Sequence, residues 1–438
     1  MKCQALAYAT AILLTMHAPY ASSITEIQFW HAMSGTAGEQ VAELASRFNA
    51  SQPGYRIVPV YKGGYEDAFA AGIAALRTRT APHIIQVFDA GTATMLTTQR
   101  ALKPLYRLMA EAGEKLDARA YIPAVSSSYA DSRGRLLSLP FNSSTAVFFY
   151  NKDLFRKARI DPAVAPKTWR DVQVVAEKIR DSDAAPCAYT TDWQSWILVE
   201  NLSAWHNEPL ATRDNGFGGA GAKLNFNGEL LIRHIGLMSS WIKSGLFTYA
   251  GRANEGEAKF ASGECAMITA SSAAYPAFAK SARFAFAVSR LPYYEEFRNA
   301  PYNTIVRGAS LWVPAGKKKS EYKGIAKFFN FLTRPEIQAD WDRQTGYLPN
   351  TLAAYALIRT QGYYERNPGA DIAVEQVSRK LRAHSRGVRL VNFPRIRAVI
   401  DEELEAVWSQ AKTPKEALDS AVARGNELLR RFERSGQG

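Results

Sequence analysis

The chain has 438 residues, of which 47% are hydrophobic, and its 54 Lys and Arg against 41 Asp and Glu give a formal net charge of +13. This length exceeds what one core usually holds, so two domains are expected, and three cysteines exclude a disulfide scaffold. Because the Lys and Arg residues are scattered, the charge predicts a solvated basic surface and argues against a nucleic-acid partner.

The first segment, residues 1–23, has the pattern of a secretory signal peptide. Lys2 gives it a basic start, an apolar stretch follows from Ala5 to Met16, and small residues precede the expected cleavage site. About a dozen apolar residues are too few for a membrane-spanning helix, which needs ~20. We therefore expect export to the periplasm and the loss of Cys3 with the leader.

Two cysteines, Cys187 and Cys265, remain in the expected mature chain. An oxidising compartment permits one bridge between them if they meet in space. The sequence alone leaves open both a disulfide and two buried free thiols.

From Ile24 onward, strand-like and helix-like segments alternate, in the order ITEIQFW, EQVAELASRFNAS, RIVPVY, DAFAAGIAALRTR and HIIQVF. This rhythm predicts an α/β domain with a mostly parallel sheet. After a break at Pro140 and Asn142, STAVFFYN predicts the first strand of a second α/β domain. The next segment predicts a helix with Thr168 as its N-cap and Asp171 three residues later.

Later segments predict that the chain returns to its first domain. GECAMITASS at 263–272 predicts a buried strand that ends in hydroxyls, and GASLWVP at 308–314 predicts a fresh strand. Such a late strand is explained by a chain that crosses back. Helices are expected to follow, including an amphipathic helical tail from Arg397. The predicted boundaries are 24–139 and 308–343 for lobe 1, and 140–307 and 344–438 for lobe 2.

No pattern of catalytic or metal-binding residues emerges. The six histidines are isolated and none has metal-ligand spacing, so neither a metal nor a cofactor is expected. Gly216, Gly218 and Gly221 match GxGxxG literally, but they follow polar TRDN instead of a strand, which predicts a loop. A P-loop and a GxSxG elbow are both missing from the sequence. These observations favour a binding protein over an enzyme.

Two runs, QVFDAGTAT at 86–94 and LPFNSSTAV at 139–147, place small hydroxyls and a carboxylate at strand ends. Small ligands bind at such strand ends in open α/β sheets. Similar features recur in RGASLWVP and TGYLPN. The sequence therefore predicts the capture of a small polar molecule.

At QVFDAGTAT, PFNSST, TASS, RGASLWV, QTGYLPN and NFPRIRAVIDEELE, the chain resembles the sn-glycerol-3-phosphate-binding branch of the extracellular solute-binding proteins. The resemblance extends from residue 29 to residue 433. It implies an α/β, two-lobed periplasmic binding protein (type II) fold with a ligand cleft between the lobes. It also implies a receptor that closes on sn-glycerol 3-phosphate and delivers it to an ABC permease and ATPase complex in the inner membrane.

Carried over by position, the resemblance implies these ligand-binding residues: Tyr65, Asp89, Ser144, Trp193, Trp196, Ser271, Gly308, Tyr347 and Arg397. A phosphate only accepts hydrogen bonds, so Arg397, the serine and tyrosine hydroxyls and the Gly308 N–H are suited to surround it. Asp89 is suited to accept from glycerol hydroxyls, while Tyr65 and the tryptophans cover the carbon chain.

Two positions depart from the pattern that the resemblance implies. Asp89 stands where Glu is typical, and the shorter carboxylate either moves the hydroxyl end of the ligand or admits a larger ligand. Arg307 stands beside Gly308 where a second Gly is typical. As a possible additional contact, Arg307 either tightens anion binding or points to solvent at the hinge.

Three alternatives stand beside this reading. The same receptor class can favour glycerophosphodiesters such as glycerophosphocholine, whose cationic head would lie over Trp193 or Trp196. A secreted hydrolase of glycerophosphodiesters has only the carboxylate and the serines in its favour, and lacks base and metal motifs. An oligosaccharide receptor shares the two-lobed fold, but Arg397 with its hydroxyl shell argues for an anion.

Overall fold

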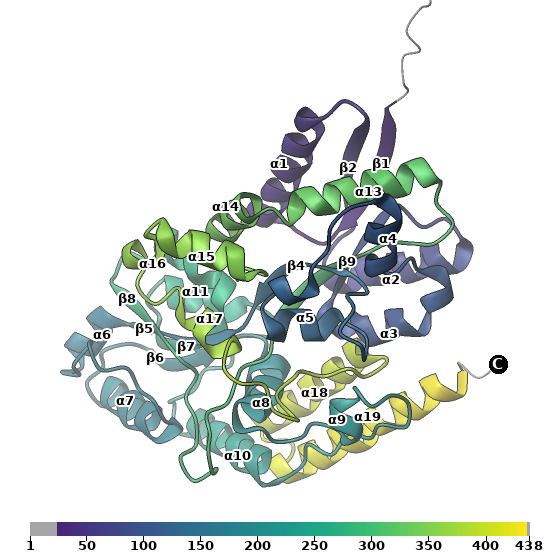
Figure 1. The fold of residues 1–438 in the computed structure, drawn as a ribbon. Coiled ribbons are helices and arrows are strands. Elements are labelled where there is room, and N and C mark those ends of the chain that lie inside the picture. Colours follow the sequence, from purple (N-terminus) through teal and green to yellow (C-terminus); the bar gives the residue numbers. More distant parts are fainter. Residues whose placement is uncertain (1–23, 436–438) are drawn as a thin grey trace, which may run out of the picture.

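Two β-sheets, each flanked by helices, form the two lobes of the protein (Figure 1). The computed structural model describes residues 24–435. The expected signal peptide, residues 1–23, lies outside the described residues. The mixed α/β architecture with two sheets agrees with the predicted two-lobed fold.

The first sheet has five strands in the order β2-β1-β3-β9-β4. Their bounds are β1 (Thr25–His31), β2 (Tyr55–Tyr61), β3 (Ile84–Phe88), β4 (Leu139–Ser144) and β9 (Arg307–Trp312). The first three strands run parallel, as the strand and helix alternation predicts. The returning strand β9 enters between β3 and β4 and is antiparallel to both.

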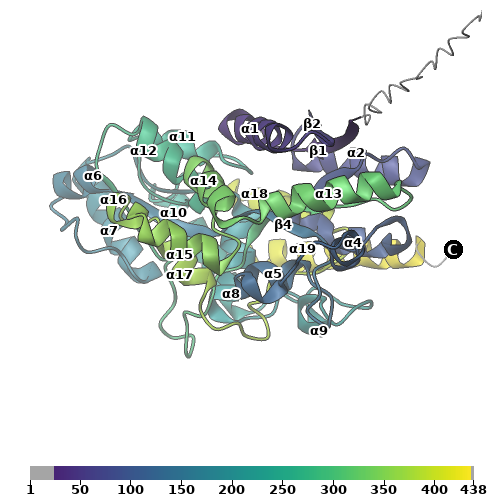
Figure 2. The ribbon, with the colours of Figure 1, turned by 45° about the horizontal axis from the view of Figure 1, so that its top comes forward.

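Helices cover both faces of this sheet (Figures 1 and 2). They are α1 (Gly35–Ser51), α2 (Tyr65–Thr78), α3 (Thr92–Thr97), α4 (Leu105–Ala112), α5 (Pro123–Tyr129), α13 (Lys319–Leu332) and α14 (Pro335–Thr345). Helix α13 buries Phe328 and Phe329 in the core of the first lobe. A Cβ at Gly324 would lie 2.3 Å from the ring of Tyr55 and 2.4 Å from Ile27, so a glycine allows this helix to contact the sheet closely.

The second sheet has four strands in the order β6-β7-β5-β8. They are β5 (Ala146–Asn151), β6 (Cys187–Thr191), β7 (Cys265–Ser271) and β8 (Phe286–Ser289). Only β6 and β7 pair in parallel, and a disulfide joins Cys187 to Cys265 where these two residues face each other. The structure therefore decides between the bridge and two free thiols in favour of the bridge.

The helical segments around the second sheet include one π-helical turn, η4, directly before α8. The segments are α6 (Lys152–Lys157), α7 (Trp169–Asp181), η4 (Ser195–Asn201), α8 (Leu202–His206), α9 (Thr212–Asn215), α10 (Glu229–Lys243), α11 (Glu255–Ala261), α12 (Tyr275–Ser281), α15 (Leu352–Thr360), α16 (Tyr363–Arg366), α17 (Ile372–Val377), α18 (Phe393–Trp408) and α19 (Pro414–Ser435). The predicted cap of α7 is confirmed, since Thr168 and Asp171 form a capping box. The GxGxxG run after α9 lies outside helices and strands, as expected.

The break expected at Pro140 and Asn142 is wrong, because both residues lie inside β4. Proline has no N–H for the ladder, and a register shift between Pro140 and Asn142 accommodates it while β4 continues to Ser144. The predicted lobe boundary at 139/140 thus falls within a strand of the first sheet. The boundary at 343/344 falls within α14, which ends at Thr345.

Helix α18 lies between the two lobes. It contacts the short 3₁₀ helix η1 (Asp89–Gly91), which follows β3, and also contacts η4 and α10 of the second lobe. Figure 1 shows α18 below α5 of the first lobe and above α19, against which it packs. This position brings side chains of three distant segments to one place.

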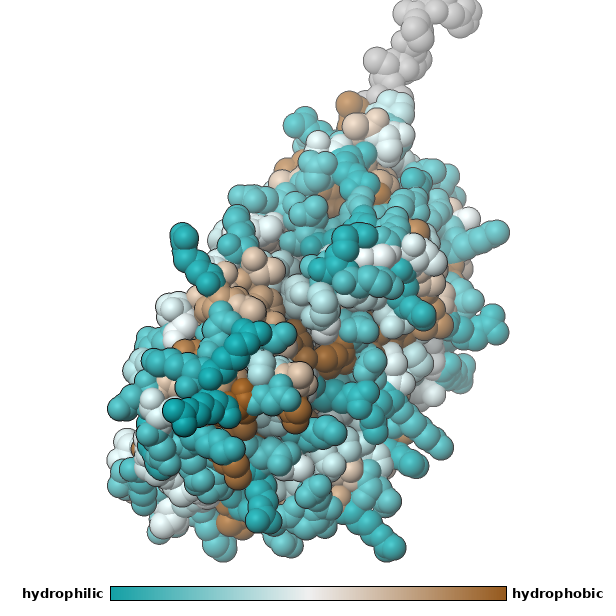
Figure 3. All heavy atoms as spheres, turned by 90° about the vertical axis from the view of Figure 1, so that its left-hand side faces the viewer, coloured by the Kyte–Doolittle hydropathy of each residue, from teal (hydrophilic) through white to brown (hydrophobic). Residues whose placement is uncertain are grey.

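Polar side chains cover most of the face shown in Figure 3, and hydrophobic ones gather mainly across its middle. No helix within residues 24–435 is both long and apolar enough to span a bilayer.

Candidate functional site

The candidate site lies where η1, η4, the start of β9 and the first turn of α18 meet. Asp89 opens η1 directly after β3, and Arg307 is the first residue of β9. Arg397 lies in the first turns of α18. Strand ends and helix starts therefore bring these three charged side chains together from positions far apart in sequence.

Arg397 is held between two carboxylates, and we call Arg397, Asp89 and Glu200 the Arg397 cluster. Arg397 Nε donates to Glu200 Oε1 at 2.6 Å, and Nη2 donates to Glu200 Oε2 at 2.8 Å. The same Nη2 donates to Asp89 Oδ2 at 2.6 Å. Glu200 is 1% exposed and Arg397 is 7% exposed. The bidentate geometry is the strong form of charge-assisted pairing.

Burial and charge act together on the pKa values of the Arg397 cluster. Burial raises the pKa of Glu200, and the Arg397 guanidinium opposes that rise. Burial by itself would lower the pKa of Arg397, but the charges of Asp89 and Glu200 outweigh it, so the pKa is raised. Arg397 is therefore a permanent cation that is largely neutralised inside the protein.

Two atoms of the Arg397 cluster keep free hydrogen-bonding capacity. Arg397 Nη1 and Asp89 Oδ1 are buried and have no hydrogen-bond partner among the described residues. The neighbouring Thr92 hydroxyl is also buried without a hydrogen-bond partner among the described residues, and Thr92, Asp89 and Arg397 line one small cavity. The cluster can thus still donate to an anion and accept from a hydroxyl.

Arg307 has very different surroundings, and we call Arg307, Trp193, Trp196, Tyr65 and Tyr347 the Arg307 subsite. The Arg307 guanidinium carbon lies 3.8 Å from the ring centroid of Trp193 and 5.6 Å from that of Trp196. Its closest charged partner is Asp89, with Nε 4.0 Å from Oδ1. No described residue accepts a hydrogen bond from this guanidinium.

Burial lowers the pKa of Arg307, and the charge of Arg397 acts in the same direction, while Asp89 opposes both. The side chain is 9% exposed. Of the two outcomes that the sequence left open, the structure has Arg307 directed into the site and not toward solvent. Its five N–H groups are available for an acceptor.

Tyr65 and Tyr347 supply hydroxyls beside Arg307. Tyr65 stacks on Phe88, with 5.5 Å between the ring centroids, and its hydroxyl accepts from Asn142 Nδ2 at 2.8 Å. Tyr347 stacks on Trp341, with 5.9 Å between the centroids. Burial raises the pKa of both tyrosines, and Arg307 opposes the rise. Both hydroxyls therefore stay protonated and can donate.

Gly308 holds the backbone beneath Arg307 close to β4. Its φ is +138°, and a Cβ there would lie 1.9 Å from the carbonyl oxygen of Asn142. The neighbouring pair in the antiparallel register is Ser144 with Arg307. A glycine is therefore required at this position, and the close approach of the strands sets where the Arg307 side chain starts.

The remaining predicted residues differ in whether their side chains are free to contact a ligand. Ser271 ends β7, and its hydroxyl accepts from the N–H of Ala273 as a cap. Trp193 is partly buried with a φ of +43°, whereas Trp196 is 1% exposed and belongs to the core of the second lobe. Trp193 is consequently the ring of the pair that can present a surface to a ligand.

Sequence reasoning missed Glu200 and Asn142. Glu200 is a lone carboxylate in the apolar run SWILVENL, which is a signal for a buried ion pair, but the sequence does not name its partner. Asn142 lies in the PFNSST run and links Tyr65 to Gln86, whose Nε2 donates to Asn142 Oδ1 at 2.9 Å. Among residues 24–435 there is also no group of three or more metal-ligating side chains.

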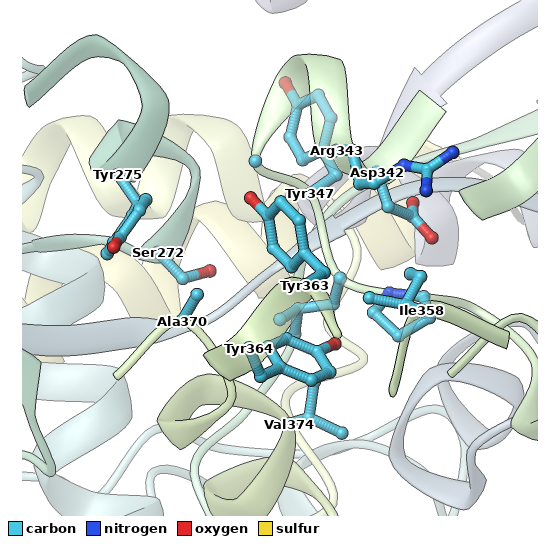
Figure 4. Close-up of a pocket in the computed structure, with 13 residues that line it drawn as sticks. Ser272, Tyr275, Asp342, Arg343, Tyr347, Ile358, Tyr363, Tyr364, Ala370 and Val374 are labelled. Atoms are coloured by element: carbon cyan, nitrogen blue, oxygen red, sulfur yellow. The ribbon is translucent and has the colours of Figure 1, made fainter. Parts of the chain in front are cut away.

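A second cavity shares Tyr347 with the site (Figure 4). Tyr275 and Ser272 lie on one side of it and Asp342 on the other, with Tyr363 between them. The Asp342 carboxylate is 5% exposed, and neither of its oxygens has a hydrogen-bond partner among the described residues. Burial raises its pKa well above the ordinary value. The cation that lines this cavity, Arg343, is paired with Asp340 at 2.5 Å.

Comparisons with known proteins agree with this architecture. Residues 43–370 match the family model of the bacterial extracellular solute-binding proteins. The chain is 50% identical over 429 residues to an sn-glycerol-3-phosphate-binding periplasmic protein, UgpB, of Yersinia pestis, covering 98% of this chain and 97% of that protein. It is also 50% identical over 417 residues to UgpB of Escherichia coli, with 95% of each chain covered.

Solved structures show the same fold at lower identity. The UgpB of Mycobacterium tuberculosis in complex with glycerophosphocholine superposes with a TM-score of 0.77 at 22% identity, covering 93% of this chain and 99% of that one. A cyclic alpha-maltosyl-1,6-maltose binding protein from Arthrobacter globiformis gives a TM-score of 0.75 at 21% identity, covering 93% and 100%. The predicted type II binding-protein fold is confirmed.

Proposed function

The chain belongs to the bacterial extracellular solute-binding protein family, and on that premise we propose that it captures sn-glycerol 3-phosphate in the cleft between its lobes. Proteins of this family are receptors of ABC importers and not enzymes, and this chain is such a receptor. The identity of 50% over nearly the whole chain supports the ligand.

The observation that carries the proposal is the unsatisfied Arg307 guanidinium beside the Arg397 cluster. A buried cation without acceptors is costly, and an acceptor-only phosphate removes that cost by accepting several charge-assisted hydrogen bonds. Arg397 Nη1 and the hydroxyls of Tyr65 and Tyr347 add donors from other directions. Ser144, Ser271 and the backbone at Gly308 complete the proposed phosphate shell.

The glycerol end of the ligand needs acceptors. Asp89 Oδ1 is the buried carboxylate oxygen that has no hydrogen-bond partner, so it is suited to accept from a glycerol hydroxyl. The exposed part of Trp193 covers the carbon chain beside it. Asp89 and Arg397 are in direct contact with each other. The glycerol end and the phosphate end of the ligand would therefore be bound by neighbouring side chains.

A second candidate ligand is a glycerophosphodiester. It is favoured by the glycerophosphocholine that accompanies the mycobacterial UgpB structure. Against it stands Arg307, a cation that already lies on the ring of Trp193 where a choline headgroup would bind. We therefore place the monoester first and keep the diester as the alternative.

Delivery follows from the class of receptor. We propose that residues 1–23 direct the chain to the periplasm, and that the closed form docks on a permease and ATPase complex in the inner membrane. Closure requires that the ligand makes contacts in both lobes. The first lobe supplies Asp89 and Arg307, and the second supplies Trp193 and Glu200, with α18 between them.

Calorimetric titration of the ligand-stripped protein over residues 24–438 tests the proposal. We expect one-to-one binding of sn-glycerol 3-phosphate and no heat with maltose, a neutral sugar. Preference for glycerophosphocholine would keep the receptor class and reassign the ligand. Binding of maltose without binding of either phosphoester would contradict an anion receptor.

A further inference from the structure

One face of the Trp193 ring is covered by a cation that belongs to the protein itself. Arg307 stacks on this ring at 3.8 Å, while Trp196 is too deeply buried to offer a second platform. We propose that Arg307 is the residue that determines ligand specificity, because it occupies the aromatic surface that a quaternary ammonium headgroup would need. This inference rests on the proposed function and names the ligand class within it: phosphate monoesters, with choline diesters excluded.

The first step of the argument is occupancy. A trimethylammonium group binds proteins mainly by cation–π contact with aromatic faces, since it has no N–H to donate. Trp gives the strongest contact of this kind. In this cleft the guanidinium already takes that contact, so a choline headgroup would have to displace Arg307 from the ring.

The second step is charge. Arg397 is balanced by Asp89 and Glu200, but the nearest carboxylate oxygen to Arg307 is 4.0 Å away and already belongs to the Arg397 cluster. A cationic headgroup on the ring of Trp193 would therefore meet the like charge of Arg307. Like charges at such distances in a buried site repel more strongly than in water.

The third step is that Arg307 cannot easily leave. Its backbone is part of the β4 and β9 ladder opposite Ser144, and Gly308 holds the strands in close contact beneath it. The side chain is 9% exposed, and its guanidinium lies on the ring of Trp193.

Arg307 should also raise the affinity for a phosphate monoester. A monoester phosphate carries its charge at the end of the molecule and can receive several of the free N–H groups of Arg307. A diester carries less charge and places a bulky substituent on the phosphate. Arg307 thus discriminates by attraction of one ligand and by exclusion of the other, which is how selective sites commonly work.

The test compares the two ligands in Arg307→Ala and Arg307→Gln, both checked for folding by thermal unfolding. Affinity for sn-glycerol 3-phosphate should fall roughly 10- to 100-fold, as expected for lost hydrogen bonds to a charged group. Affinity for glycerophosphocholine should rise about 3- to 30-fold through the exposed ring. Adding Trp193→Ala to Arg307→Ala should remove that gain. Arg307→Lys, which keeps the charge, should still prefer the monoester.

Arg290→Ala serves as the matched control, because Arg290 is a half-exposed arginine paired with Glu375. It should leave the ratio of the two affinities unchanged. Suppose that the unmodified protein binds the monoester and that Arg307→Ala leaves the ratio of the two affinities unchanged. The specificity role of Arg307 is then overturned, while the proposed function stands. If the unmodified protein binds neither phosphoester, the proposed function and this inference both fall.

Discussion

The Arg397 cluster and the Arg307 subsite are neighbours that meet at Asp89, yet the surroundings of their two buried guanidinium groups are opposite. Arg397 makes three hydrogen bonds to two carboxylates, whereas Arg307 makes none to any described side chain and rests on a tryptophan. A buried ion pair contributes to the stability of the fold, because removing one partner leaves the other as an unpaired buried charge. A buried charge without a partner is available to bind a ligand.

The largest expected effect is on the paired side. Arg397→Met should lower the free energy of unfolding by roughly 3–5 kcal/mol, because Glu200 would be left as a buried carboxylate without a partner. Ligand binding should be lost as well. Urea unfolding monitored by circular dichroism measures the first effect.

The double variant Glu200→Gln with Arg397→Met is the control for this prediction. It removes both charges, so most of the lost stability should return while binding stays absent. If the single variant is as stable as the unmodified protein, the ion pair has no architectural role.

Removing the disulfide should change stability without changing ligand affinity, because Cys187 and Cys265 lie on paired strands of the second sheet and not among the candidate site residues. The pair Cys187→Ala with Cys265→Ala opens a loop with a sequence separation of 78 residues and should cost roughly 2–4 kcal/mol of stability. Affinity measured by calorimetry should stay within twofold. A large loss of affinity would mean that the bridge holds the cleft itself.

Asp401 tests an unpaired carboxylate on the same helix as Arg397. Burial raises its pKa to about 7, although Ser195, Gln194 and the charge of Arg252 act to lower it. Between about pH 4 and pH 7 the native state holds a proton that the unfolded chain has lost. Its contribution to stability is therefore complete below pH 4 and is lost as the pH rises through 7.

Asp401→Asn should remove this dependence. The stability of the unmodified protein should fall, relative to the variant, by at most about 1.4 kcal/mol per pH unit over that range. Urea unfolding of both proteins at pH 5, 6, 7 and 8 measures the difference. Parallel profiles would show that Asp401 is ionised throughout.

The smallest expected effect has the opposite sign. Arg307→Met removes a buried charge that has no hydrogen-bonded partner, so the ligand-free protein should gain about 1 kcal/mol of stability. The matching change at Arg397 is strongly destabilising, which makes the pair a direct test of the comparison. A loss of stability in Arg307→Met would show that Arg307, like Arg397, stabilises the fold.

Local patterns predicted most of the fold. The alternation of strand and helix signals in the first lobe and the Thr168 cap depend on side chains close in sequence, and the structure has both. The break at Pro140 was wrong because the neighbouring strand β9, which arrives about 170 residues later, holds β4 together with a register shift.

The sequence by itself determined the family and the two-domain α/β plan, since these depend on motifs and periodicity. Only the tertiary structure decided which charges are satisfied. Glu200 reaches Arg397 across 197 positions and Asp89 across 308, while Arg307 meets Trp193 and no acceptor. Pairing depends on distances of a few ångströms between segments remote in sequence, and local pattern carries no information about those distances.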